Sequence, residues 1–169
     1  MPTVYLSIGT NIGNKKDNIK KAILKLNSIG KILNISSIYL TSPLENTNQP
    51  YFYNCVVKMK VNMTPKFLLE NIKRIEYEMG RKRNKIRYQP RIIDIDILFY
   101  GKEVIKSRTL TIPHKKLHKR KFVLWPLNEI EPNLVHPLLH KKVITLTKQL
   151  KDKTQKIKKI FTLKLKYLY

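Results

Sequence analysis

Two acidic residues, Asp94 and Asp96, stand out because the positions around and between them are almost all aliphatic. We expect a strand over residues 92–99, in which side chains two positions apart share one face. The two carboxylates then project together and repel each other unless a positive charge lies between them. Magnesium suits such a pair, because it binds one or two carboxylates together with substrate phosphates. We interpret the pair as a metal site; the alternative is an exposed strand face that is acidic by chance.

Four arginines lie directly before these acids, in the polar stretch 81–91: Arg81, Arg83, Arg87 and Arg91. The planar guanidinium group binds phosphate through two hydrogen bonds, whereas lysine acts as a point charge. Arginine and magnesium around a polyphosphate are typical of phosphoryl transfer. A solvated basic loop is the alternative in so basic a chain. With the acid pair, the arginines predict a site for a nucleoside triphosphate.

The common nucleotide-binding motifs are absent from the sequence. Residues 9–15, Gly-Thr-Asn-Ile-Gly-Asn-Lys, follow an expected strand and precede an expected helix. A phosphate-binding P-loop needs four residues between its glycines and a Gly-Lys-Ser/Thr ending, so we interpret this stretch as a structural turn. No protein-kinase signature is present either.

The composition is that of one folded domain over residues 1–169, with a large excess of positive charge. Lysine and arginine number 35 against 11 acids, for a net charge of +24. Such a charge favours polyanions as partners, but we somewhat favour the alternative that drift toward AT-rich codons added lysines without any partner. No apolar run reaches the roughly 18–20 residues needed to span a bilayer. The single cysteine, Cys55, and a start without signal-peptide features lead us to expect a cytoplasmic protein.

Strands and helices interleave, and several strands follow each other without a crossover helix, which favours an α+β sandwich with a largely antiparallel sheet. Thr64 and Pro65 form a helix-start signal. The expected strands are 4–8, 31–40, 52–61 and 92–99, and the expected helices are 19–29, 65–79, 122–130 and one from 141. Loops are expected at 41–50, 81–90 and 114–121, a hairpin within 102–112, and a basic, partly mobile tail at 151–169.

The segment Arg87-x-x-Pro90-Arg91-x-x-Asp94-Ile95-Asp96-Ile97-Leu98 resembles the signature of the 6-hydroxymethyl-7,8-dihydropterin pyrophosphokinase family of folate synthesis. The resemblance extends, in family order, to residues 5–11, 41–44, 49–54, 110–114 and 120–127. It departs from the family at Tyr88, where tryptophan is usual, at Gln89, where glycine is usual, and at Thr109, where arginine is expected.

The resemblance implies a ferredoxin-like αβα sandwich and transfer of diphosphate from ATP, as co-substrate, to the pterin hydroxymethyl group, giving AMP. Asp94 and Asp96 would hold two Mg²⁺ ions, and the catalytic residues would be Arg81, Arg91 and Asp96. The implied ATP-binding residues are Glu76, Arg83, Arg87, Arg91, Ile97, Thr111, His114 and Arg120. The implied pterin-binding residues are Thr41, Ser42, Leu44, Phe52, Asn54, Asp94 and Phe122, with Asn54 hydrogen-bonding the amide edge of the pterin and Phe122 stacking on it.

Two alternatives stay open. A small basic nucleic-acid-binding module would explain the charge and the nine tyrosines, although no such motif is present and the acid pair would repel a phosphate backbone. A family member that keeps the fold without activity would explain the departures. We expect small-molecule partners only, ATP and a reduced pterin, with no membrane, no specific nucleic acid and a monomeric state.

Overall fold

The computed structural model describes residues 1–83 and 86–167. Its main sheet has six strands, all paired antiparallel, in the order β5-β1-β4-β3-β8, with β2 beside β4. These strands are β1 (Thr3–Thr10), β2 (Lys31–Ile35), β3 (Ile38–Thr41), β4 (Phe52–Lys60), β5 (Asp94–Tyr100) and β8 (Ile157–Phe161). A separate hairpin joins β6 (Ile105–Lys106) to β7 (Thr111–Ile112).

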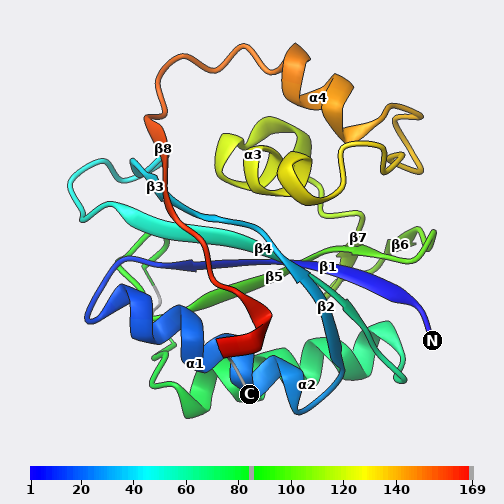
Figure 1. Ribbon diagram of the computed structural model, residues 1–169, viewed down its shortest axis with the longest axis horizontal. Helices are drawn as coiled ribbons and strands as arrows, with labels where there is room; N and C mark the ends of the chain where they lie inside the picture. Colours follow the sequence, from blue (N-terminus) through cyan, green and yellow to red (C-terminus); the bar gives the residue numbers. More distant parts are fainter. Residues whose placement is uncertain (84–85, 168–169) are drawn as a thin grey trace.

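Helices cover both faces of the sheet, as Figure 1 shows. The helices α1 (Lys15–Asn27) and α2 (Pro65–Glu78) lie on one face, and α3 (Lys121–Ile130) and α4 (Val143–Gln149) lie on the other. Two short 3₁₀ turns, η1 (Leu117–Lys119) and η2 (Leu165–Tyr167), complete the elements. The expected α+β sandwich with an antiparallel sheet is confirmed.

Each face of the sheet has its own hydrophobic core. One core packs Leu6, Ile8, Ile95 and Ile97 against α1 and α2, and the other packs Val56 and Leu98 against α3 and α4. Side chains alternate between these faces along β5, so the aspartates share the face of α3 with Leu98. The site therefore lies on the α3 side of the sheet.

Sequence signals account for the helix starts. The Thr64 side chain accepts a hydrogen bond from the Phe67 amide, and Pro65 occupies the first turn, as expected. Asn14 caps α1 in the same way by accepting from the Asp17 amide. Residues 9–15 therefore lead from the end of β1 through a turn to the cap of α1. This confirms that the stretch is a structural turn and not a P-loop.

The prediction of a single strand over residues 31–40 is wrong. The structure divides it at Ser36–Ser37 into β2 and β3, which both pair with β4. The Ser36 hydroxyl accepts the Val56 amide hydrogen bond, and the Ser36 amide donates to the Val56 carbonyl. The Ser36 hydroxyl thus takes the place of a backbone carbonyl as the acceptor for one strand-to-strand hydrogen bond. The alternation of hydrophobic residues in the sequence does not reveal this substitution.

The C-terminal segment contains strand β8, which the sequence analysis did not predict. β8 pairs with β3 and extends the main sheet at its edge (Figure 1). Its alternation is weak because Lys158 and Lys159 are both exposed. Within the described residues, no helix has the length and apolar character needed to cross a membrane.

Candidate active site

The two aspartates stand side by side on the β5 face that is not packed against α2. Asp94 lies opposite Gly9 and Asp96 opposite Ser7 on the neighbouring strand β1. Ile93, Ile95 and Ile97 are at most 5% exposed, as the alternation predicted. Strand geometry alone therefore places both carboxylates on one surface.

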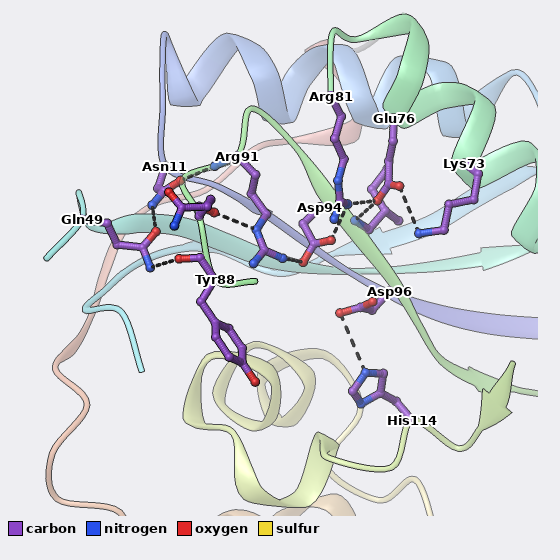
Figure 2. Close-up of polar contacts among 12 residues, drawn as sticks. Asn11, Gln49, Lys73, Glu76, Arg81, Tyr88, Arg91, Asp94, Asp96 and His114 are labelled. Atoms are coloured by element: carbon purple, nitrogen blue, oxygen red, sulfur yellow. Dashed lines mark hydrogen bonds and ion pairs between the residues drawn. The ribbon is translucent and has the colours of Figure 1, made fainter. Parts of the chain in front are cut away.

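Asp94 is held between two of the predicted arginines, as Figure 2 shows. Arg81 Nη1 lies 2.5 Å from Asp94 Oδ1, and Arg91 Nη1 lies 2.7 Å from Asp94 Oδ2. Burial alone would raise the pKa of Asp94, but the charges of Arg91 and Arg81 outweigh it and lower this pKa. Asp94 is thus a fixed anion between two cations.

Among the described residues, no lysine or arginine lies within ion-pair distance of Asp96. Burial, followed by repulsion from Asp94, raises the pKa of Asp96 to about 6. His114 Nε2 is 3.9 Å from Asp96 Oδ2, but burial and then the charge of Arg120 lower the pKa of His114 to about 4. A neutral imidazole gives Asp96 no counter-charge, and the positive charges of Arg120 and Lys73 only partly offset the effects that raise its pKa.

This donor set fits a hard dication that brings further oxygen ligands with it. Two carboxylates on adjacent same-face positions match magnesium, which keeps waters and substrate phosphates in its shell. No group of three or more His, Cys, Asp or Glu side chains able to hold a metal occurs within the described ranges. The protein itself therefore offers two carboxylates, and phosphate or water oxygens would supply the remaining ligands.

Glu76, on α2, connects the arginines to the strand. Its Oε1 accepts from Arg81 Nη1 at 2.6 Å and from the Ile95 amide at 2.8 Å, and its Oε2 is 3.2 Å from Lys73 Nζ. Glu76 is only 3% exposed, so the carboxylate is shielded from solvent. It fixes the end of α2, and hence Arg81, against the aspartates (Figure 2).

Two cavities meet at this charged cluster. The first, about 340 Å³, runs from the aspartates to β3. It is lined by Asp96, Arg81, Arg91, His114 and Arg120, and by all seven predicted pterin-binding residues: Thr41, Ser42, Leu44, Phe52, Asn54, Asp94 and Phe122.

The second cavity, about 830 Å³, is lined mainly by α2 and the arginine loop. Four predicted ATP-binding residues border it: Glu76, Arg83, Arg87 and Arg91. Ile97 packs into the core beside α1 and α2, and Thr111 lies on β7; neither lines these two cavities. Residues 84 and 85 of the predicted loop lie outside the described residues.

The loops around the cavities are joined through Asn11, in the turn after β1. Its side chain donates to Gln49 Oε1 and to the Pro50 carbonyl, and it accepts from the Arg91 amide. Gln49 also donates to the Tyr88 carbonyl. The loop after β3 and the arginine loop are therefore tied to one buried amide (Figure 2).

The departure from the family pattern at residues 88 and 89 has a visible backbone setting. Tyr88 has a φ of 58°, in the left-handed region, whereas Gln89 is not among the positive-φ residues. The unusual backbone conformation is therefore at Tyr88, one residue before the position where the family usually has glycine.

Sequence reasoning missed several residues of the first cavity. Lys73, Gln49 and Gln155 line it, and the sequence analysis assigned none of them a role, although Gln49 lies in the segment 49–54 that resembles the family. Lys73 has a weak signal, since it precedes Glu76 by three positions on a helix and so shares its face. Gln155 has none, because its place depends on the unpredicted pairing of β8.

A family model described as 7,8-dihydro-6-hydroxymethylpterin-pyrophosphokinase (HPPK) matches residues 5–132. The chain belongs to this family. It is 45% identical over 141 residues to the 2-amino-4-hydroxy-6-hydroxymethyldihydropteridine pyrophosphokinase of Aquifex aeolicus, covering 83% of this chain and 88% of that protein. It is 37% identical over 155 residues to the Haemophilus influenzae protein of the same name, covering 90% of this chain and 95% of the relative.

Some relatives are much longer proteins. The Dictyostelium discoideum folic acid synthesis protein FOL1 is 43% identical over 137 residues, which cover 81% of this chain but 21% of that protein. A crystal structure of Plasmodium falciparum HPPK-DHPS wild type with pteroate has a TM-score of 0.72 at 21% identity. It covers 88% of this chain and 42% of that one. This likeness supports the ferredoxin-like fold.

Proposed function

We propose that this chain transfers a diphosphate group from ATP to the hydroxymethyl group of 6-hydroxymethyl-7,8-dihydropterin, giving AMP and the pterin diphosphate in tetrahydrofolate biosynthesis. One observation carries the proposal: an acid pair and two arginines lie where an arginine-lined cavity meets a cavity lined by amide, hydroxyl and aromatic groups. Family membership supplies the reaction, and the arrangement supplies a place for each substrate.

We assign Asp94 and Asp96 to hold two Mg²⁺ ions. Magnesium bound there would neutralise phosphate charge and align the triphosphate. Asp94 contributes a carboxylate that is already ionised, whereas Asp96 must lose its proton against a raised pKa before it binds a cation. Metal binding at about pH 6 or below should therefore release protons.

Arg81 and Arg91 would neutralise the transferring group. Both lie within hydrogen-bonding distance of Asp94, and both line the first and the second cavity. A triphosphate is a competing anion, and two oxygens of one phosphate group can accept the two parallel N–H groups of a guanidinium. Arg83, Arg87, His114, Arg120, Glu76, Ile97 and Thr111 remain our candidates for holding ATP.

The pterin would lie in the first cavity between β4 and α3. Asn54 Nδ2 donates to Thr41 Oγ1 at 2.6 Å, which fixes the Asn54 amide for hydrogen bonding to the pterin edge. Phe122 lines the same cavity, and Arg120 lies 5.4 Å from its ring centre. An aromatic ring in this position can stack on a flat heterocycle.

We also propose that the chain forms a single pyrophosphokinase domain, since β8 near its end joins the same sheet as β1. A monomer in the cytoplasm remains our working expectation.

The test is AMP formation from ATP and Mg²⁺, with and without the hydroxymethyl dihydropterin. Wild type should form AMP only when the pterin is present. Asp96→Asn should abolish this pterin-dependent AMP, because one metal-binding carboxylate is removed. Glu70→Gln, which removes an exposed acid from α2, is the matched control and should leave the rate unchanged.

AMP production that is independent of pterin would overturn the proposed acceptor. A wild type that binds both substrates without forming AMP would instead identify an inactive family member. Equal activity in Asp96→Asn and wild type would refute the metal assignment.

A further inference from the structure

The C-terminal segment contributes a wall of the first cavity, although it lies beyond residue 132, where the family match ends. Ser42 pairs with this segment through its amide, which donates to the Lys156 carbonyl, and through its hydroxyl, which accepts from the Lys156 amide. Strand β8 then continues along β3. The loop after β3, which is predicted to bind the pterin, is therefore supported by Gln155 and its neighbours.

The position of Gln155 is fixed at both ends. Asp152 Oδ1 accepts from the Thr154 amide and the Gln155 amide, forming a tight turn, and Lys121 Nζ donates to the Gln155 carbonyl. At the other end, Gln155 Nε2 donates to the Ser42 carbonyl at 2.8 Å. A carbonyl oxygen only accepts, so the amide nitrogen must face it.

The other amide atom, Gln155 Oε1, is buried and has no hydrogen-bond partner within the described part of the chain. Gln155 as a whole is 4% exposed and lines the first cavity. An acceptor left unsatisfied in a buried position costs about 1–3 kcal/mol. Oε1 itself has almost no surface open to the cavity, so a donor on a bound molecule would remove this cost once the Gln155 side chain shifts toward it.

The strand order determines which part of a pterin would face Gln155. The aspartates lie on β5 at one edge, and Gln155 directly precedes β8 at the other, four strand steps away. At about 4.8 Å per step, the strand axes are about 19 Å apart, so a pterin bound between them would lie across β1, β4 and β3. With the hydroxymethyl group at the aspartates, the amino-bearing pyrimidine ring points toward β3 and β8.

We propose that Gln155 is a substrate-binding residue whose Oε1 accepts a hydrogen bond from the 2-amino group of the pterin. The inference rests on the proposed function and extends it to a residue outside the family match. Gln155 Nε2 meanwhile holds the Ser42 carbonyl, so a single side chain supports the loop and binds the substrate. A buried acceptor of this kind discriminates against analogues that lack the donor, because they leave it unpaired.

The test measures selectivity in addition to rate. Gln155→Met removes the amide while keeping chain length and volume, and Gln149→Met changes an exposed glutamine on α4 as the matched control. Pterin-dependent AMP formation and fluorescence titration are compared for the hydroxymethyl dihydropterin and its analogue without the 2-amino group. Wild type and Gln149→Met should prefer the amino compound by about tenfold or more.

Gln155→Met should raise the KM for the pterin by a similar factor, leave the KM for ATP within about twofold, and lose the preference for the amino compound. Loss of the Ser42 support alone would weaken both compounds equally and leave their ratio unchanged, which would overturn the proposal. Gln155→Glu keeps an acceptor but loses the donor to the Ser42 carbonyl, so it should bind both compounds more weakly and still retain the preference. If Gln155→Met does not fold, Gln155→Asn, which withdraws the oxygen by one methylene, should lose the preference instead.

Different results would refute the proposed function and the role of Gln155. A wild type that forms no pterin-dependent AMP and does not bind the pterin would refute the proposed function. An active wild type whose preference persists in Gln155→Met would refute only the role of Gln155.

Discussion

At the scale of single residues, Gly9 shows how the absence of a side chain shapes the pterin end of the site. Gly9 faces Asn54 across the β1–β4 pair, and a Cβ atom built on it would lie 2.6 Å from Asn54 Oδ1. The Asn54 amide can hold its place beside Thr41 only because residue 9 has no side chain.

We therefore expect Gly9→Ala to displace the Asn54 amide and raise the KM for the pterin about tenfold, the equivalent of one hydrogen bond of about 1.4 kcal/mol. The KM for ATP, measured on the same preparation, should change little because Gly9 does not line the second cavity. Equal increases in both KM values would point to a general disturbance of the sheet.

The ionised side chain of Asp96, which the proposed metal binding requires, destabilises the folded protein. The pKa of Asp96 is raised to about 6 in the folded protein, so ionisation of this carboxyl lowers the free energy of unfolding. This loss of stability is absent below the pKa of the group in the unfolded chain, near 4, and grows as the pH rises through 6. Asp96→Asn should thus raise the free energy of unfolding at about pH 8 while abolishing transfer. The side chain is 34% exposed, and after allowance for solvent screening we expect a gain of about 1–2 kcal/mol.

Urea unfolding without metal or nucleotide, at about pH 8 and about pH 4, checks this expectation. The gain should be present at the higher pH and vanish at the lower one. A variant that is no more stable than wild type at about pH 8 would contradict it.

At the scale of elements, two glutamates attach α3 to the sheet. Glu129 Oε1 accepts from the Ser37 amide at 2.9 Å and hydroxyl at 2.8 Å, and its Oε2 accepts from Tyr39 at 2.5 Å. Glu131 accepts from Tyr5 at 2.9 Å and also contacts Lys58. Helix α3 carries Phe122 to the cavity, so these contacts position part of the site.

Burial would raise the pKa of Glu129, but hydrogen bonds from Tyr39 and Ser37 lower it overall. A lowered carboxyl pKa gives stability that is present above the unfolded pKa near 4.5 and is lost as the pH falls through the folded value. Glu129→Gln should therefore cost about 1–3 kcal/mol at neutral pH and less in acid. Thermal unfolding at about pH 7 and about pH 4, with Glu70→Gln as control, measures the difference; a pH-independent loss would exclude a role for the charge.

The elements also show what the sequence could and could not predict. The helix cap at Thr64 and the alternation around Asp94 are local signals, and both led to correct predictions of an element. The division between β2 and β3 depends on the Ser36 hydroxyl meeting Val56, and β8 depends on pairing with β3. These contacts are long-range, so Gln155 could not be placed from its neighbours, whereas the aspartates and arginines could.

At the scale of the whole molecule, the net charge of +24 surrounds a site for an anionic substrate. Such a field raises the association rate of ATP and is screened by salt. We expect kcat/KM for ATP to fall about tenfold between roughly 0.05 M and 0.5 M salt. The same measurement for the uncharged pterin serves as the control and should change far less. Parallel declines for both substrates would show that salt acts on the enzyme and not on the encounter.

The place of β8 at the end of the strand order gives its lysines a further consequence. The outer edge of a terminal strand presents unpaired N–H and C=O groups, which can template pairing with another molecule and start fibrous aggregation. Lys156, Lys158 and Lys159 are exposed along this edge and oppose such pairing through charge repulsion. Replacing these lysines to make the protein less basic would therefore open a path to aggregation, even if catalysis and folding were untouched.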